Sequence, residues 1–211
     1  MRRVVVLALL VLVLPIAAWA DGITLTNQFG TISISTAGIS SHGSQLRSWG
    51  AIVTGGSMGS VSFSTGALLT GTIAGGGTFA GGAGSSFDVL GVGSWAAKLT
   101  GAVGCGAGCP LFTGSFVGPV TWTFTGFSGP HGGTLDYTLT GTVTGTLWNG
   151  RTVTGTTTEN FFTNNGQLVA GIAHISGGTT LLPVPEPGTL GLLGTGLVGI
   201  AGMFRRKLRG A

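Results

Sequence analysis

The stretch of sequence that decides the fold runs from Thr134 to Thr158 and reads TLDYTLTGTVTGTLWNGRTVTGTTT. Its first part alternates hydrophobic residues with threonines, which is the period of a β-strand that buries one face. The hydrophobic residues in phase are Leu135, Tyr137, Leu139, Val143 and Leu147. Gly141 and Gly145 are expected to mark kinks or bulges. Asn149-Gly150 favours a type I′ hairpin turn, so Thr152 to Thr158 is predicted to return as the partner strand.

Other short segments carry the same signal. Val120 to Thr125 reads VTWTFT and places Val120, Trp122 and Phe124 on one face. Weaker strand candidates are residues 24–25, 31–35, 61–64 and 167–176. The glycine-rich run from Ala74 to Ser86 is predicted to be a loop or an irregular edge. No segment repeats at helical spacing, so the sequence predicts an all-β, antiparallel, sandwich-like body rich in Gly, Thr and Ser.

A β-solenoid is the alternative architecture, because glycine and threonine recur throughout the chain. A solenoid should show a fixed repeat of about 20–50 residues, and none is found. The mean hydropathy of +0.55 and the 7% of charged residues exclude a solvated disordered chain. The 211 residues suffice for one domain.

The net charge of +4 belongs to the two ends of the chain. Between the ends the cations are Arg47, Lys98 and Arg151, and the anions are Asp21, Asp88, Asp136 and Glu159. The body is therefore close to neutral and lacks a basic stripe that could neutralise a run of phosphates. Nucleic acid is excluded as a partner.

The N-terminus reads MRRVVVLALLVLVLPIAAWA and has the three parts of a secretory signal peptide. Two arginines precede a short apolar run, and small residues follow it. Ala18 and Ala20 match the pattern that signal peptidase requires, so cleavage is expected after Ala20 and the chain should engage the export machinery. An uncleaved membrane anchor is the alternative, although the apolar run is shorter than the roughly 20 residues of a span.

Residues 183–211 read PVPEPGTLGLLGTGLVGIAGMFRRKLRGA. The prolines of 183–187 should keep that segment extended and accessible. Residues 188–204 carry no charge and, as a helix of about 25 Å, are predicted to cross a thin bilayer. The basic residues of 205–211 should stop transfer and stay in the cytoplasm, which places the body outside. These residues are Arg205, Arg206, Lys207 and Arg209.

This arrangement resembles a PEP-CTERM sorting signal: Val184, Pro185, Glu186 and Pro187 precede a Gly/Leu-rich helix and an Arg-rich end. The resemblance implies recognition by an exosortase, a membrane-embedded enzyme of Gram-negative-type bacteria whose substrates are associated with exopolysaccharide and biofilm. It divides the chain into a signal peptide (1–20), an exported domain (21–182), a sorting motif (183–187), a transmembrane helix (188–204) and a tail (205–211). The resemblance implies that this chain is the substrate and supplies no catalytic residue.

Cys105 and Cys109 are the only cysteines, and three residues separate them in CGAGC. Export places them in an oxidising compartment, so a local disulfide is predicted that acts as a structural clip, in preference to a redox or metal role. His42, His131 and His174 are scattered, so neither a metal site nor a cofactor is predicted.

The sequence offers little for catalysis, since Asp88, Asp136 and Glu159 lie in no recognisable motif. The tryptophans at 49, 95, 122 and 148 suggest carbohydrate binding or, alternatively, a hydrophobic core. Trp122 is expected to be buried, and Trp148 has the better chance of exposure. We therefore expect a non-enzymatic protein of the cell surface or extracellular matrix, transiently membrane-anchored and linked to exopolysaccharide or biofilm. The alternatives are a carbohydrate-binding module, a protein anchored by its C-terminal helix and, third, a glycan-acting enzyme.

Overall fold

Antiparallel pairing joins the strands of the body into one sheet. The computed structural model describes residues 22–100, 108–128, 133–163 and 171–184. The body, Ile23–Pro183, forms one unit. Its elements are β1 (Gly22–Gln28), β2 (Thr31–Ser35), β3 (Gly38–His42), β4 (Ser44–Trp49), β5 (Ile52–Val53), β6 (Gly59–Ser64), β7 (Leu68–Thr72), β8 (Gly76–Phe79), β9 (Ser86–Gly91), α2 (Gly93–Thr100), β10 (Cys109–Ser128), β11 (Thr134–Leu147), β12 (Thr152–Thr163) and β13 (Gly171–Pro183). The all-β, antiparallel prediction is confirmed.

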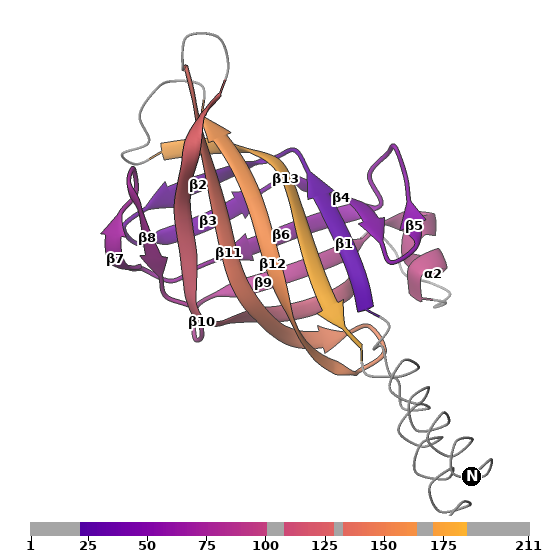
Figure 1. The fold of residues 1–211 in the computed structure, drawn as a ribbon. Helices are drawn as coiled ribbons and strands as arrows, with labels where there is room; N and C mark the ends of the chain where they lie inside the picture. The colour runs from indigo at the N-terminus through magenta and orange to yellow at the C-terminus, as the bar shows by residue number, and fades with distance from the viewer. Residues whose placement is uncertain (1–21, 101–107, 129–132, 164–170, 185–211) are drawn as a thin grey trace, which may run out of the picture. The chain divides into compact units, whose positions relative to one another are not determined.

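The sheet closes on itself into an eight-stranded antiparallel barrel with extra strands at its ends. The ring runs β2–β13–β12–β11–β10–β9–β6–β3 and back to β2. Figure 1 shows β10 to β13 in front of β2, β3, β6 and β9, with β7 and β8 at one end and β5 and α2 at the other. The predicted antiparallel strands therefore form, but they close into a barrel instead of the predicted sandwich-like arrangement, and the solenoid alternative does not fit this antiparallel ring.

The length of β10 explains why the sheet closes. This strand has 20 residues and pairs with β11 along one side, while its other side pairs first with β9 and then with β8. A long twisted strand carries its neighbours around, and closure satisfies the backbone groups that an open sheet would expose at its edges. The sequence marks the strands but not the curvature that joins the first strands to the last.

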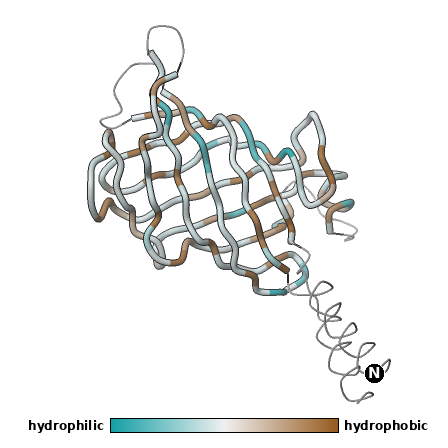
Figure 2. Tube along the Cα trace, viewed as in Figure 1, coloured by the Kyte–Doolittle hydropathy of each residue, from teal (hydrophilic) through white to brown (hydrophobic). Residues whose placement is uncertain are grey.

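The interior is aromatic. The ring of Phe63 lies 6.2–6.5 Å from the rings of Phe87, Phe116 and Phe161, and all four side chains are buried. The five residues predicted in phase on 134–147 are buried too. Along the strands, hydrophobic positions alternate with neutral ones (Figure 2). Alternation therefore predicted correctly which residues of 134–147 face the core.

Hydrogen bonds from Trp122 and Tyr137 hold the turn of the β7–β8 hairpin against the barrel. The Trp122 indole Nε1–H donates to the carbonyl oxygen of Ile73 at 2.8 Å, and the Tyr137 hydroxyl donates to that of Ala74 at 3.0 Å. Val120 and Trp122 are buried as predicted, whereas Phe124 is half-buried. Part of the predicted loop 74–86 is strand β8, which pairs with β10.

The β11–β12 hairpin forms as predicted, but its turn type differs. Gly150 has a φ of 79°, and Asn149 is not among the residues with positive φ, so this is not a type I′ turn, which needs positive φ at both. The β11–β12 register is unbroken at Gly141 and Gly145, but Gly141 lies opposite a bulge in β10, where the β10–β11 register shifts between Val117 and Thr121. A side chain at Gly141 would meet the ring of Phe116, and one at Gly145 would meet the backbone of Thr113. These glycines make room for close packing.

Helix α2 was not predicted, because eight residues are too few to establish a helical repeat. Within the described ranges, no helix has both the length and the apolarity needed to cross a membrane. The predicted transmembrane helix 188–204 lies outside the described residues.

Candidate functional site

The predicted sorting motif begins where the sheet ends. Strand β13 stops at Pro183, which is exposed, and Val184 follows it half-buried. Proline cannot donate to a strand ladder, which explains why the sheet stops here. The other predicted sites lie outside the described residues, namely Pro185, Glu186 and Pro187 of the motif, Arg205, Arg206, Lys207 and Arg209 of the tail, and Ala18 and Ala20 of the signal peptide.

Cys109 opens β10 and is disulfide-bonded. Cys105 lies outside the described residues, so the predicted pairing of the two stays a prediction.

We expect the exported protein to carry no free thiol, because its two cysteines lie in one short loop and the destination is oxidising. Thiol labelling of denatured, unreduced protein measures this directly. The variant Cys109→Ser should give one label per chain, and reduced wild type should give two. Two labels on unreduced wild type would disprove the disulfide.

The tryptophans do not form the solvent-facing row that a carbohydrate platform needs. Trp49 and Trp122 are buried, while Trp95 and Trp148 are half-buried. The rings of Trp49 and Trp148 pack edge to face at 5.8 Å, and the Lys98 ammonium lies 4.8 Å from the centre of the Trp95 ring. Core packing therefore accounts for Trp49 and Trp122, as the alternative interpretation proposed.

A polar cluster lies inside the barrel around Glu159, whose side chain is completely buried. The Asn27 amide Nδ2 donates to Glu159 Oε2 at 2.8 Å and to Ser44 Oγ at 2.8 Å. Thr157 donates to Glu159 Oε1 at 3.4 Å and accepts a hydrogen bond from Thr180 at 2.8 Å. Gly178 leaves the space for this cluster, because a Cβ there would clash with the Glu159 carboxyl and with Asn27 Oδ1.

Burial raises the pKa of Glu159 from 4.5 to about 7, although its hydrogen bonds with Asn27 and Thr157 lower it in part. The folded barrel therefore favours the neutral acid. The sequence prediction assigned no position to this residue, although its strand carries a signal for one. Glu159 is in phase with Val153 and Phe161, so the alternation of β12 already directs it inward.

The other described carboxylates do not join Glu159. Asp88 and Asp136 lie on the outer face, and their partners on β10 are Thr113 and Gly126, which lie in opposite halves of that strand. Burial raises the pKa of Asp88, against a hydrogen bond from Thr113. In the described part of the chain, no three His, Cys, Asp or Glu residues are placed to hold a metal ion.

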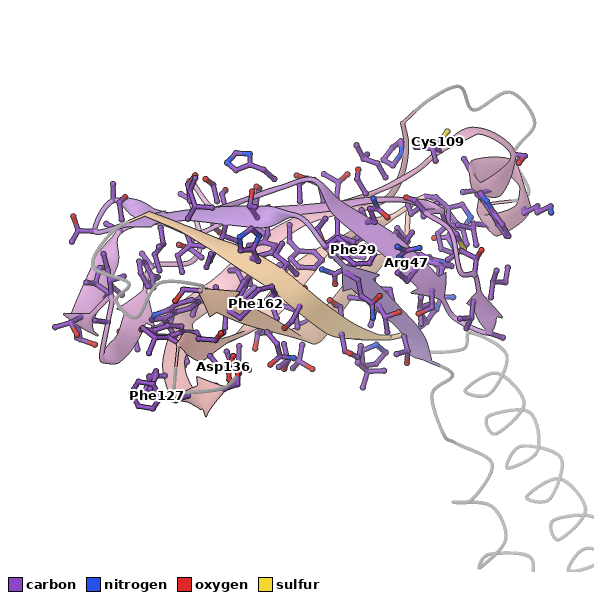
Figure 3. All side chains as sticks on the ribbon, turned by 90° about the horizontal axis from the view of Figure 1, so that it is seen from above. Phe29, Arg47, Cys109, Phe127, Asp136 and Phe162 are labelled. Atoms are coloured by element: carbon purple, nitrogen blue, oxygen red, sulfur yellow. The ribbon has the colours of Figure 1, made fainter. Side chains whose placement is uncertain are left out.

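Phe29 and Arg47 form a second cluster, on the outer face where β1 passes into β2. The Arg47 guanidinium carbon lies 4.8 Å from the centre of the Phe29 ring, and its Nη1 donates to the carbonyl oxygen of Gly55. Figure 3 labels both residues. The side chain of Phe29 remains 54% exposed.

Two irregularities of the backbone present this pair. Phe29 is the one described non-glycine residue with positive φ, at 65°, and Gly30 follows with 86°. Arg47 is an extra residue on β4, since Thr26 pairs with Ser48 and Asn27 with Leu46. Positive φ costs a bulky residue about 1–2 kcal/mol, whereas an exposed cation–π contact returns about 0.5–1 kcal/mol. Packing alone does not explain a phenylalanine here.

Comparison with known proteins identifies the segment that follows the barrel. The described residues define an antiparallel barrel whose last strand ends at Pro183. The family model for the PEP-CTERM protein-sorting motif matches residues 183–207, so the chain carries this motif and the resemblance is confirmed. The motif implies export, membrane-associated sorting and processing by an exosortase. Neither a curated protein nor a solved structure matches the chain.

Proposed function

We propose that this chain is a non-enzymatic protein of the cell surface or extracellular matrix, delivered there by exosortase processing and associated with exopolysaccharide or biofilm. The observation that carries the proposal is the sorting motif at residues 183–207, directly after the last strand of the barrel. In this function the barrel is the part of the chain that reaches the cell surface or matrix, and residues 183–211 direct its sorting and processing.

The arrangement of acidic groups supports a non-enzymatic role. Hydrolysis by paired carboxylates needs two of them to converge on one bond. Glu159 faces the interior, whereas Asp136 on the neighbouring strand faces outward, opposite Phe162. Asp88 lies on β9, which pairs with β6 and β10. The described carboxylates therefore offer no pair.

Changing Pro185, Glu186 and Pro187 together to alanine is expected to block processing while export and membrane insertion continue. The prolines keep the segment extended within reach of an enzyme in the bilayer, and residues 188–204 with the basic tail hold it there. The measurement is the mass of the mature C-terminus, from cells with and without the exosortase. An uncleaved, membrane-bound form should accumulate in the triple variant.

The variant Thr189→Ala is the matched control, because it lies beside the motif without altering a proline or the acid, and it should be processed normally. Deleting residues 205–209 should instead weaken retention before processing. A C-terminus ending at Ala211 in both strains would contradict the proposal and identify an ordinary membrane anchor.

A further inference from the structure

We propose that Phe29 and Arg47 form a binding site for an anionic polysaccharide, one that contains uronic acid sugars. The inference deepens the proposed surface function and rests on it, because an exported protein meets extracellular polymers. The site consists of Phe29, Arg47, Gln28 and Gln45, and we call it the Phe29–Arg47 site.

The backbone departs from regular strand geometry both at Phe29 and at Arg47, and these departures place the two side chains on the outer face. This geometry supports a site. Gly30 cannot carry a side chain, since a Cβ there would meet the backbone of His42 and Ser44. The carbonyl oxygen of Gly30 accepts a hydrogen bond from the amide of Ile175 at 3.0 Å, which fixes the bend against β13. Bulges often redirect a side chain beside a functional site, and Arg47 lies at a bulge.

The polar groups of the site match a carboxylated sugar. The guanidinium of Arg47 can donate to a carboxylate from Nη2, because Nη1 donates to the carbonyl oxygen of Gly55 and Nε is buried without a partner. Gln28 and Gln45 are register partners whose side chains face outward, where their amides can donate to and accept from sugar hydroxyls. The exposed ring of Phe29 offers an apolar surface to the C–H groups of a sugar.

Charge selects an anionic ligand over a neutral one. Among the described residues, Arg47 has no carboxylate partner: Asp88 lies on β9, Asp136 lies on β11, and Glu159 faces the interior, where Asn27 donates to it. The local potential at the site is therefore positive on a body that is otherwise nearly neutral. Gln28 and Gln45 of the site carry amides, which suit a glycan better than the apolar centre of a protein interface.

Affinity gel electrophoresis of the full chain in neutral detergent tests the site. The probes are alginate, a linear polyuronate, and dextran, a neutral polysaccharide. Alginate should retard wild type and dextran should not, and raising the salt concentration should weaken the retardation. Phe29→Asn and Arg47→Gln should each lower the apparent affinity for alginate about tenfold or more. Asparagine tolerates positive φ, so the melting temperature of Phe29→Asn should be equal to that of wild type or higher.

Matched controls come from the same body. Phe127→Asn removes another exposed phenylalanine, and Lys98→Gln removes the cation that stacks on Trp95. Both should bind alginate as wild type does. The site is overturned if alginate does not retard wild type, if dextran retards it equally, or if the controls lose as much affinity as the site variants. Failure of the proposed surface function would appear instead as an unprocessed C-terminus, which these variants do not affect.

Discussion

Replacing Trp122 with alanine is expected to lower the free energy of unfolding by about 3–5 kcal/mol. The indole is 1% exposed, stacks on Tyr137 with the ring centres 4.7 Å apart, and lies 5.4 Å from the ring of Phe161. Alanine leaves a cavity among these rings and removes the donor to the carbonyl of Ile73. Thermal unfolding should show a fall of roughly 6–20 °C in Tm.

Two further variants separate the contributions of Trp122. Trp122→Phe keeps an aromatic ring and loses the N–H donor, so about 1–3 kcal/mol should be lost. Trp95→Ala removes a half-buried indole from helix α2 and should cost less than Trp122→Ala. Equal losses for Trp122→Ala and Trp95→Ala would contradict a core centred on Trp122.

The local structure of the body could be predicted from the sequence, whereas its closure could not. Alternation in VTWTFT and in TLDYTLTGTVTGTL reports the two faces of each strand, since the burial of every second residue is a local property. Closure depends on the pairing of β13 with β2, in which Ala173 lies opposite Ile32, 141 residues earlier in the chain. Sheet curvature leaves no such alternating signal.

The candidate sites likewise differ in how far the sequence alone predicts them. The sorting motif is a contiguous segment with its own composition, so its residues identified it. The Phe29–Arg47 site depends on a bulge and on one positive φ, which residue types do not reveal for a phenylalanine. Glu159 could be predicted only in part. Alternation directs its side chain inward, but its hydrogen-bond partner Asn27 is distant in sequence.

Glu159 should make the barrel less stable as the pH rises, and Glu159→Gln should remove most of that dependence. The folded pKa of about 7 lies above the 4.5 of an ordinary glutamate because burial penalises the carboxylate. A raised folded pKa means that the folded state holds the proton more tightly. Its stabilising contribution is complete below pH 4.5, falls from there to pH 7, and is absent above.

The difference between these pKa values corresponds to about 3 kcal/mol at most. Glutamine has the same shape and still accepts from Asn27, but it carries no charge at any pH. Chemical denaturation of both proteins at pH 5 and pH 8.5 measures the effect. Wild type should lose stability between the two pH values, whereas Glu159→Gln should change little and should be more stable than wild type at pH 8.5.

Asp136→Asn, which removes a carboxyl group from the outer face, is the control and should keep the wild-type fall in stability. Some residual slope is expected from Asp88, whose pKa burial also raises. A wild-type stability that is constant or rises from pH 5 to pH 8.5 would show that Glu159 is charged inside the folded barrel.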